Sequence, residues 1–216
     1  MTIDAENCQV VRLPDVSIPV KAVLRRLGYP SDTEEINGEA NRIFWEEVKN
    51  APSLLHPVGV FRLLRVRSKE DDSITFRNSA FVIRSRQVAR MLMDSEWVAI
   101  FMVTIGSVLE EEVKRRFDQQ EMAGAVILDA IGSETTDTVA DRMHRVVLKE
   151  MAEEKGFSVT PRFSPGYGDW PVTVQGEVLD VCGGHKVGIS VNESYLMIPR
   201  KSVSAVLGWV RKDDGL

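Results

Sequence analysis

One short segment of the chain combines a cation, glycines and aromatic rings, which together could bind a small charged molecule. It covers residues 161–171 and reads PRFSPGYGDWP. Arg162 can hold a carboxylate through two parallel hydrogen bonds. Glycines such as Gly166 let a ligand approach the backbone closely, and a ring such as Tyr167 can stack on an adenine or attract a sulfonium. S-adenosylmethionine (SAM) has a carboxylate, an adenine and a sulfonium, but these residues fit a rigid turn with a surface arginine equally well.

Other common chemistries have no signature in the sequence. There is no glycine-rich dinucleotide fingerprint, no phosphate-binding P-loop, no Gly-x-Ser-x-Gly elbow and no His-Glu-x-x-His motif. The three histidines and two cysteines do not have metal-ligand spacing, and two cysteines are too few for an iron–sulfur cluster. We therefore predict no metal site and assign no catalytic residue.

Composition limits the class of protein. The 216 residues carry a net charge of −5, with 44% hydrophobic and 27% charged residues, which indicates a globular chain and argues against a nucleic-acid partner. The longest apolar run, residues 97–105, is too short to cross a bilayer, and the acidic N-terminus is unlike a signal peptide. A reduced, cytoplasmic protein in which Cys8 and Cys182 are free thiols is the simplest expectation.

The hydrophobic patterns predict a β-rich middle with helices before and after it. Helical spacing predicts a helix over residues 20–27 that ends at Gly28, and a second after a capping box of Ser31 and Glu34. Residues 58–66 and 73–76 are typical of a hairpin. The unbroken apolar run at residues 97–104 predicts a central buried strand. We expect Arg62, Arg65 and Arg67 to lie on a solvated strand face.

Further elements follow the central strand. Ser107 and Glu110 form a second possible capping box before a helix that reaches Phe117, and residues 122–154 are expected to be largely helical, with a kink at Gly132 and Ser133. Its methionines and valines are best explained as core. Short helices are predicted at residues 87–93 and 175–181, strands at 187–191, 195–198 and 203–209, and a polar tail from residue 211.

The predicted fold class is therefore α+β, with a twisted, mainly antiparallel sheet and flanking helices. The alternation of helix and strand is too irregular for a doubly wound parallel sheet. No internal boundary is evident, so we expect one domain over residues 1–216, with residues 1–15 and 211–216 peripheral.

Three stretches resemble the activation domain of cobalamin-dependent methionine synthase. Arg162-x-x-x-Gly166-Tyr167 matches the Arg-x-x-x-Gly-Tyr motif by which that family binds SAM. Residues 104–111 with 128–133 resemble its strand–helix–helix centre, and residues 193–199 with 202–204 resemble its closing segment. Together they cover about residues 97–209, and three stretches in the right order are more specific than any one of them.

The resemblance implies a function in repair. By analogy with the family, the chain would be a stand-alone SAM-binding subunit for reductive re-methylation of the cobalamin of methionine synthase or a related corrinoid methyltransferase. Its partners would be corrinoid-binding methyltransferase modules, which carry the cobalamin, and flavodoxin or a similar reductant. Arg162 would hold the SAM carboxylate. Ser164, Pro165 and Gly166, with Tyr167, would line the adenosine side.

The sequence also departs from the family. Residues 140–142 resemble a family helix whose acidic residue contacts SAM, but the glutamate expected there is Arg145, so Asp141 or Asp137 would have to replace it. Corrinoid carriers use an Asp-x-His-x-x-Gly motif, of which only His185 and Gly188 are present. Two alternatives therefore remain open: a non-catalytic adaptor that binds SAM or a corrinoid protein, and an unrelated small-molecule enzyme on the same fold.

Overall fold

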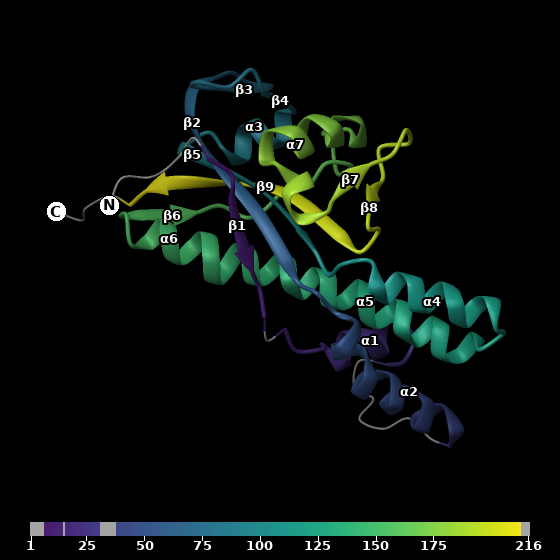
Figure 1. Ribbon diagram of the computed structural model, residues 1–216. Helices are drawn as coiled ribbons and strands as arrows, with labels where there is room; N and C mark the ends of the chain where they lie inside the picture. The colour runs from purple at the N-terminus through teal and green to yellow at the C-terminus, as the bar shows by residue number, and fades with distance from the viewer. Residues whose placement is uncertain (1–6, 15, 31–37, 213–216) are drawn as a thin grey trace.

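A seven-stranded antiparallel sheet forms the centre of the computed structural model, which describes residues 7–14, 16–30 and 38–212 (Figure 1). The strand order is β4-β3-β2-β5-β9-β6, and β1 pairs with β2. A separate two-stranded sheet contains β7 and β8. The strands are β1 (Gln9–Arg12), β2 (Val58–Lys69), β3 (Ser73–Phe76), β4 (Val82–Arg84), β5 (Ser95–Thr104), β6 (Phe157–Val159), β7 (Ser190–Val191), β8 (Met197–Ile198) and β9 (Ser202–Arg211). The predicted α+β class and antiparallel sheet are confirmed.

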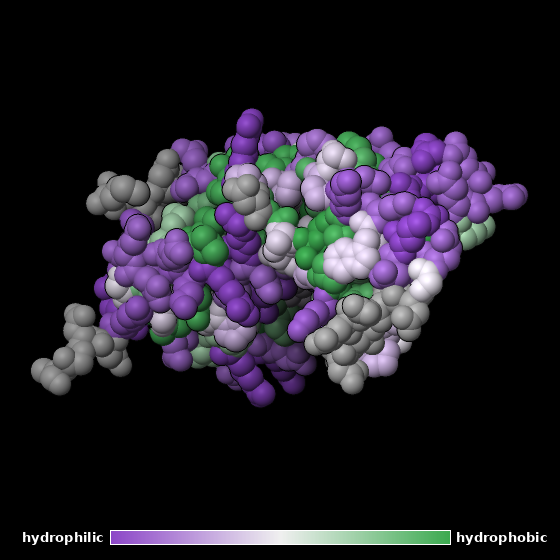
Figure 2. Space-filling model, turned by 90° about the horizontal axis from the view of Figure 1, so that it is seen from below, coloured by the Kyte–Doolittle hydropathy of each residue, from purple (hydrophilic) through white to green (hydrophobic). Residues whose placement is uncertain are grey.

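Helices cover both faces of this sheet. The α-helices are α1 (Val20–Arg26), α2 (Glu39–Asn50), α3 (Arg86–Met91), α4 (Val108–Asp118), α5 (Met122–Arg142), α6 (Lys149–Glu153) and α7 (Gln175–Cys182). Short 3-10 segments are η1 (Ala51–Leu54), η3 (Val172–Val174) and η4 (Gly184–Val187), and η2 (Met143–Leu148) is a π-helix. From below, the surface is mainly hydrophilic, with apolar side chains in between (Figure 2). No helix in the described part of the chain is long and apolar enough to cross a membrane.

β5 is the buried central strand that the apolar run predicts. It pairs with β2 on one side and with β9 on the other. Its side chains alternate between two cores: Ala99, Phe101 and Val103 face α1, α2, α4 and α5, whereas Ile100 and Met102 face α3 and α7. Because both faces are covered, the strand has no polar face, which explains why its sequence does not alternate.

Most predicted helices are confirmed, but the kink in the long helix is not where we expected it. α5 continues through Gly132 and Ser133. A Cβ atom on Gly132 would lie 2.6 Å from Cδ2 of Leu109, so this glycine allows α4 and α5 to pack closely. The helix changes instead into the π-helix at Met143. Met143 and Val139 are core residues as expected, whereas Val146 is exposed.

The second capping box is wrong, since the Ser107 side chain makes no cap hydrogen bond. The carboxylate of Glu110 instead accepts the backbone N–H of Lys201, which joins α4 to the start of β9. The capping box of Ser31 and Glu34 lies outside the described residues.

Three smaller expectations also need correction. Val187 lies in η4 and Tyr195 precedes β8, so the two strands expected there are shorter than predicted. β9 extends through Arg211, whose guanidinium pairs with Glu96. Arg62 is half-buried and donates to the carbonyl of Val181, so only Arg65 and Arg67 lie on an exposed face.

Asp169 fixes the glycine-rich segment to the N-terminus of α3. Its carboxylate accepts the hydroxyl of Ser85 and the backbone N–H groups of Arg86 and Gln87, the last two at 2.8 and 3.3 Å. The Ser85 side chain in turn accepts the N–H of Val88 at 3.1 Å as the helix N-cap. These hydrogen bonds hold the pKa of Asp169 below its ordinary value, with the largest effect from Ser85.

We predict that Asp169→Asn lowers the melting temperature near neutral pH, because the amide carries no charge for the N–H groups of α3. The pKa of Asp169 is depressed in the folded state. Its stabilisation is therefore present above the unfolded pKa, and it is lost as the pH falls through the folded pKa. Thermal melts across the acid range should show the two proteins converging at low pH.

The matched control is Asp71→Asn, because Asp71 is an exposed residue of the β2–β3 turn. It should melt like the wild type at every pH. A constant difference between wild type and Asp169→Asn down to the lowest pH would contradict the assigned cause.

Candidate functional site

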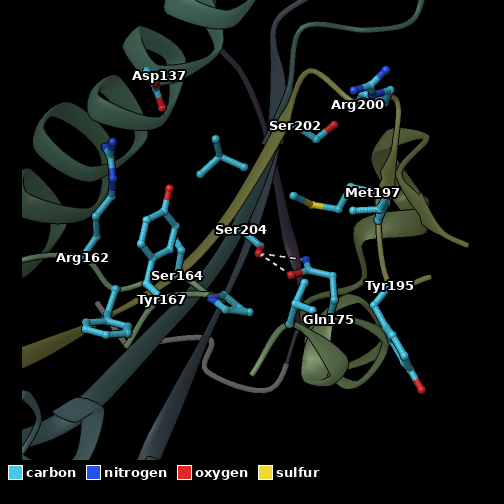
Figure 3. Close-up of a pocket in the computed structure, with 15 residues that line it drawn as sticks. Asp137, Arg162, Ser164, Tyr167, Gln175, Tyr195, Met197, Arg200, Ser202 and Ser204 are labelled. Carbon is cyan, nitrogen blue, oxygen red and sulfur yellow. Dashed lines mark hydrogen bonds between the residues drawn. The ribbon is translucent and has the colours of Figure 1, made fainter. Parts of the chain in front are cut away.

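A cavity of about 630 Å³ opens beside the predicted binding segment (Figure 3). It is lined by α5, the loop after β6, η3 and the start of α7, the segment around β8 and the first residues of β9. These contribute Asp137; Arg162, Phe163, Ser164, Pro165 and Tyr167; Val172 and Gln175; Tyr195, Leu196, Met197 and Arg200; and Ser202, Val203 and Ser204. A volume of this size is typical of small-molecule sites, which span roughly 300–1,000 Å³.

The cavity exists because one edge of β9 is only partly paired. β5 pairs with β9 along its length, but on the other edge β6 covers only residues 209–211. Phe163 then exchanges two backbone hydrogen bonds with Val206, each 2.9 Å. Beyond that point no described strand follows this edge, and the chain turns away as the glycine-rich loop. Residues 202–204 therefore face the cavity.

Arg162 lies beside the cavity and reaches toward α5 (Figure 3). Its guanidinium Nη1 donates to a carboxylate oxygen of Asp141. The Arg162 side chain is 25% exposed and that of Asp141 is 51% exposed, so the pair lies at the surface. Arginine has five N–H donors, and among the described residues only this hydrogen bond uses one of them, so others can contact a ligand.

The loop that follows Arg162 is closed by its own backbone. Gly166 adopts a φ of 92°, which favours glycine, and its N–H donates to the carbonyl of Trp170 at 2.8 Å. Trp170 is buried in the core. Ser164, Pro165 and Tyr167 line the cavity, and Tyr167 is 70% exposed. The loop thus presents an aromatic ring at the cavity mouth while its two ends are fixed.

The two candidate acids on α5 have different surroundings. Asp141 pairs with Arg162 but is not among the residues that line the cavity, whereas Asp137 lines it one turn earlier. Partial burial raises the pKa of Asp137, and the positive charge of Arg162 opposes that rise. His144 lies on the same side: burial and then Arg162 lower its pKa. Arg145 is exposed and does not line the cavity.

The floor of the cavity is a pair of buried polar residues that sequence analysis missed. Gln175 Nε2 donates to Ser204 Oγ at 2.8 Å, and the two side chains share a second contact at 3.0 Å (Figure 3). Ser202 and Ser204 are two residues apart on β9, so both point to the same face of the sheet. Two polar residues at alternate positions of a strand that is otherwise apolar were the available signal.

The opposite wall comes from the segment around β8. Met197 points into the cavity, whereas the Tyr195 ring extends away from its centre (Figure 3). Tyr195 and Leu196 line the cavity and are exposed, so this wall has an apolar rim. Arg200 adds a cation at the far end.

His185 has no role in this cavity. It is exposed on η4, directly after Gly183 and Gly184, with Gly183 in the left-handed conformation. The half-motif around His185 is therefore a turn, as interpreted from the sequence. Within the part of the chain that the structure describes, no group of three or more His, Cys, Asp or Glu residues could hold a metal.

Comparisons with known proteins give a family match and a similar fold. A family model described as the vitamin B12 dependent methionine synthase activation domain matches residues 42–212. A solved structure titled as the MetH reactivation domain bound to AdoHcy has a similar fold, with a TM-score of 0.72, 17% sequence identity, and coverage of 99% of this chain and 81% of that one. A search of curated proteins finds no match. The chain belongs to the family of the vitamin B12-dependent methionine synthase activation domain.

Proposed function

We propose that the chain binds SAM in the cavity beside Arg162 and acts in the reductive reactivation, by re-methylation, of the cobalamin of methionine synthase or a related corrinoid methyltransferase. The observation that carries the proposal is the position of Arg162, at the wall of a cavity of small-molecule size and next to a loop closed at Gly166. The domain with the similar fold is titled as bound to AdoHcy, which is SAM without its methyl group.

The residues present fit the chemical groups of SAM. Arg162 can pair with a carboxylate, and its planar guanidinium suits bidentate contact. Ser164, Pro165 and the exposed Tyr167 offer a backbone and an aromatic face for an adenosine. Asp137 supplies negative charge on the same cavity wall. The cavity lining thus contains positive, aromatic and negative groups.

In this proposal, the protein's own residues position the ligand. Arg162 fixes one end of the ligand, and the loop from Ser164 to Tyr167 fixes the other. When bound, SAM supplies a methyl group for a reduced corrinoid. Tyr167 and the apolar rim formed by Tyr195 and Leu196 lie at the mouth, where a corrinoid-binding methyltransferase module would dock. Flavodoxin or a similar protein would provide the electron. We also propose that this cycle takes place in the cytoplasm.

One observation favours a second candidate, a non-catalytic adaptor. Arg145 occupies the position where the resemblance leads us to expect a glutamate, and it is exposed and outside the cavity. An adaptor would bind SAM or a corrinoid protein through the same surfaces without supporting methyl transfer.

We predict that Arg162→Ala weakens SAM binding by about 10- to 150-fold. Hydrogen bonds to a charged group are worth about 1.5–3 kcal/mol, and each 1.4 kcal/mol is tenfold in affinity. Isothermal titration of both proteins with SAM gives the ratio. Arg145→Ala is the control, because this arginine lies outside the cavity, and its Kd should equal that of the wild type. Equal Kd values for wild type and Arg162→Ala would remove Arg162 from the site.

We also predict that the protein promotes methyl transfer from SAM to a corrinoid. The assay would contain a corrinoid methyltransferase loaded with cob(II)alamin, a flavodoxin reducing system and SAM with a labelled methyl group. Label should enter the corrinoid with the wild type and at a much lower rate with Arg162→Ala. If SAM binds but the label stays in SAM with every corrinoid protein tried, the adaptor function replaces the one proposed.

A further inference from the structure

A second, smaller cavity opens at β2, on the other side of β5 from the cavity beside Arg162. Its volume is about 280 Å³. The residues that line it come from β2, from the start of β5 and from the end of β3: Arg62, Leu63, Leu64, Arg65, Arg77, Asn78 and Trp97. The two cavities share no lining residue, so they can bind different ligands.

This second cavity exists because one edge of β2 is paired only at its two ends. β1 pairs with residues 58–61, and β3 pairs with residues 66–69 on the same edge. No described strand pairs with residues 62–64 there. Beyond β3, the backbone N–H of Arg77 donates to the carbonyl of Arg65 at 2.9 Å. The backbone therefore brings Arg62, Arg65 and Arg77 around the gap.

The charges that line the second cavity are all positive. Three arginines line it and no acidic residue does. None of the three takes part in an ion pair within the part of the chain that the structure describes. Glu96 attracts Arg65, but its carboxylate pairs with Arg211 at 2.7 Å and lies outside the cavity lining. In a chain whose net charge is −5, this is a local excess of positive charge.

Two of the three arginines are held in place by the protein. Arg62 is half-buried and donates from Nη1 to the carbonyl of Val181 at 3.4 Å. Its Nε is buried and has no acceptor among the described residues, which costs free energy until an acceptor is supplied. The guanidinium of Arg65 lies 5.7 Å from the centre of the Trp97 ring, a cation–π distance. The cavity thus has preformed cations with unused hydrogen-bonding capacity.

We propose that the second cavity binds a phosphate dianion, either free or as the end group of a phosphate monoester. Guanidinium groups match the oxygens of phosphate with parallel N–H donors, and a phosphate offers enough oxygens for three arginines. A carboxylate has one charge and two oxygens, so it would leave at least one arginine unpaired. Small-molecule sites span roughly 300–1,000 Å³, so a cavity of about 280 Å³ suits one anionic group rather than a whole nucleotide.

Calorimetric titration of single variants tests this site. Inorganic phosphate, methyl phosphate and acetate would each be titrated at constant ionic strength and about pH 8, where both phosphates are dianions. The proteins are the wild type, Arg62→Gln, Arg65→Gln and Arg77→Gln. The matched control is Arg84→Gln, which changes an exposed arginine of the same sheet outside the cavity.

We expect the wild type to bind inorganic phosphate with a Kd of about 1 mM or below, which several charge-assisted hydrogen bonds can supply, and to bind acetate at least about tenfold more weakly. Each cavity variant should weaken phosphate binding by about tenfold or more. Arg84→Gln should match the wild type. Arg65 and Arg77 are exposed, so their variants test the site even where Arg62→Gln fails to fold. Methyl phosphate distinguishes the two forms: equal binding indicates a monoester ligand, and weaker binding indicates the free anion.

Three results would overturn the inference. The wild type binds neither phosphate; or Arg65→Gln and Arg77→Gln both bind phosphate as tightly as the wild type; or acetate binds as tightly as phosphate. The proposed function is tested separately by titrating SAM into Arg65→Gln, which should bind it like the wild type because the two cavities share no residue. Failure of the wild type to bind SAM would overturn the proposed function and leave the phosphate site standing.

Discussion

The pairing of β9 is the constraint on which the site depends. Its β5 edge is occupied along its length, so β9 cannot move relative to the core. Its other edge is occupied by β6 and by Phe163, but only as far as Val206. The same backbone hydrogen bonds therefore place Arg162 beside the sheet and leave Ser202 and Ser204 facing an open space. A longer β6 would pair with these residues and fill the cavity.

The two walls of the cavity pack on opposite faces of the sheet, so the sheet sets the distance between them. α5, which carries Asp137, packs on one face, and α7, which begins at Gln175, packs on the other. β9 lies between them and contributes Ser204 to the floor. The groups that face one another across the cavity thus come from segments distant in the sequence and are held in place by packing rather than by direct bonds.

Sequence analysis succeeds for this chain where the signal is local. The unbroken apolar run identifies β5 because a strand buried on both faces needs no polar side. The residues from Arg162 to Tyr167 could be grouped because they are adjacent in the chain, and Arg162, Ser164, Pro165 and Tyr167 line one cavity. The positions of Gln175 and Ser204 could not be predicted in the same way, since their hydrogen bond depends on the register of β9 against β5. Gly132 is a second example. A glycine within a helix can mark a kink or a close contact, and only the packing of Leu109 against it shows that this one is a close contact.

If Arg162 holds a ligand carboxylate as proposed, its ion pair in the protein without ligand affects the cost of binding. Its ion pair with Asp141 holds the guanidinium in position, which lowers the entropy lost when a ligand arrives. Asp141 is half-exposed, so water and salt weaken this attraction, and such surface pairs are worth little, about 0–1 kcal/mol. A ligand carboxylate can thus share or displace Asp141 at small cost. The ion pair therefore orients Arg162 without competing strongly with a ligand. A deeply buried acid would compete more strongly, because separating a buried ion pair costs several kcal/mol.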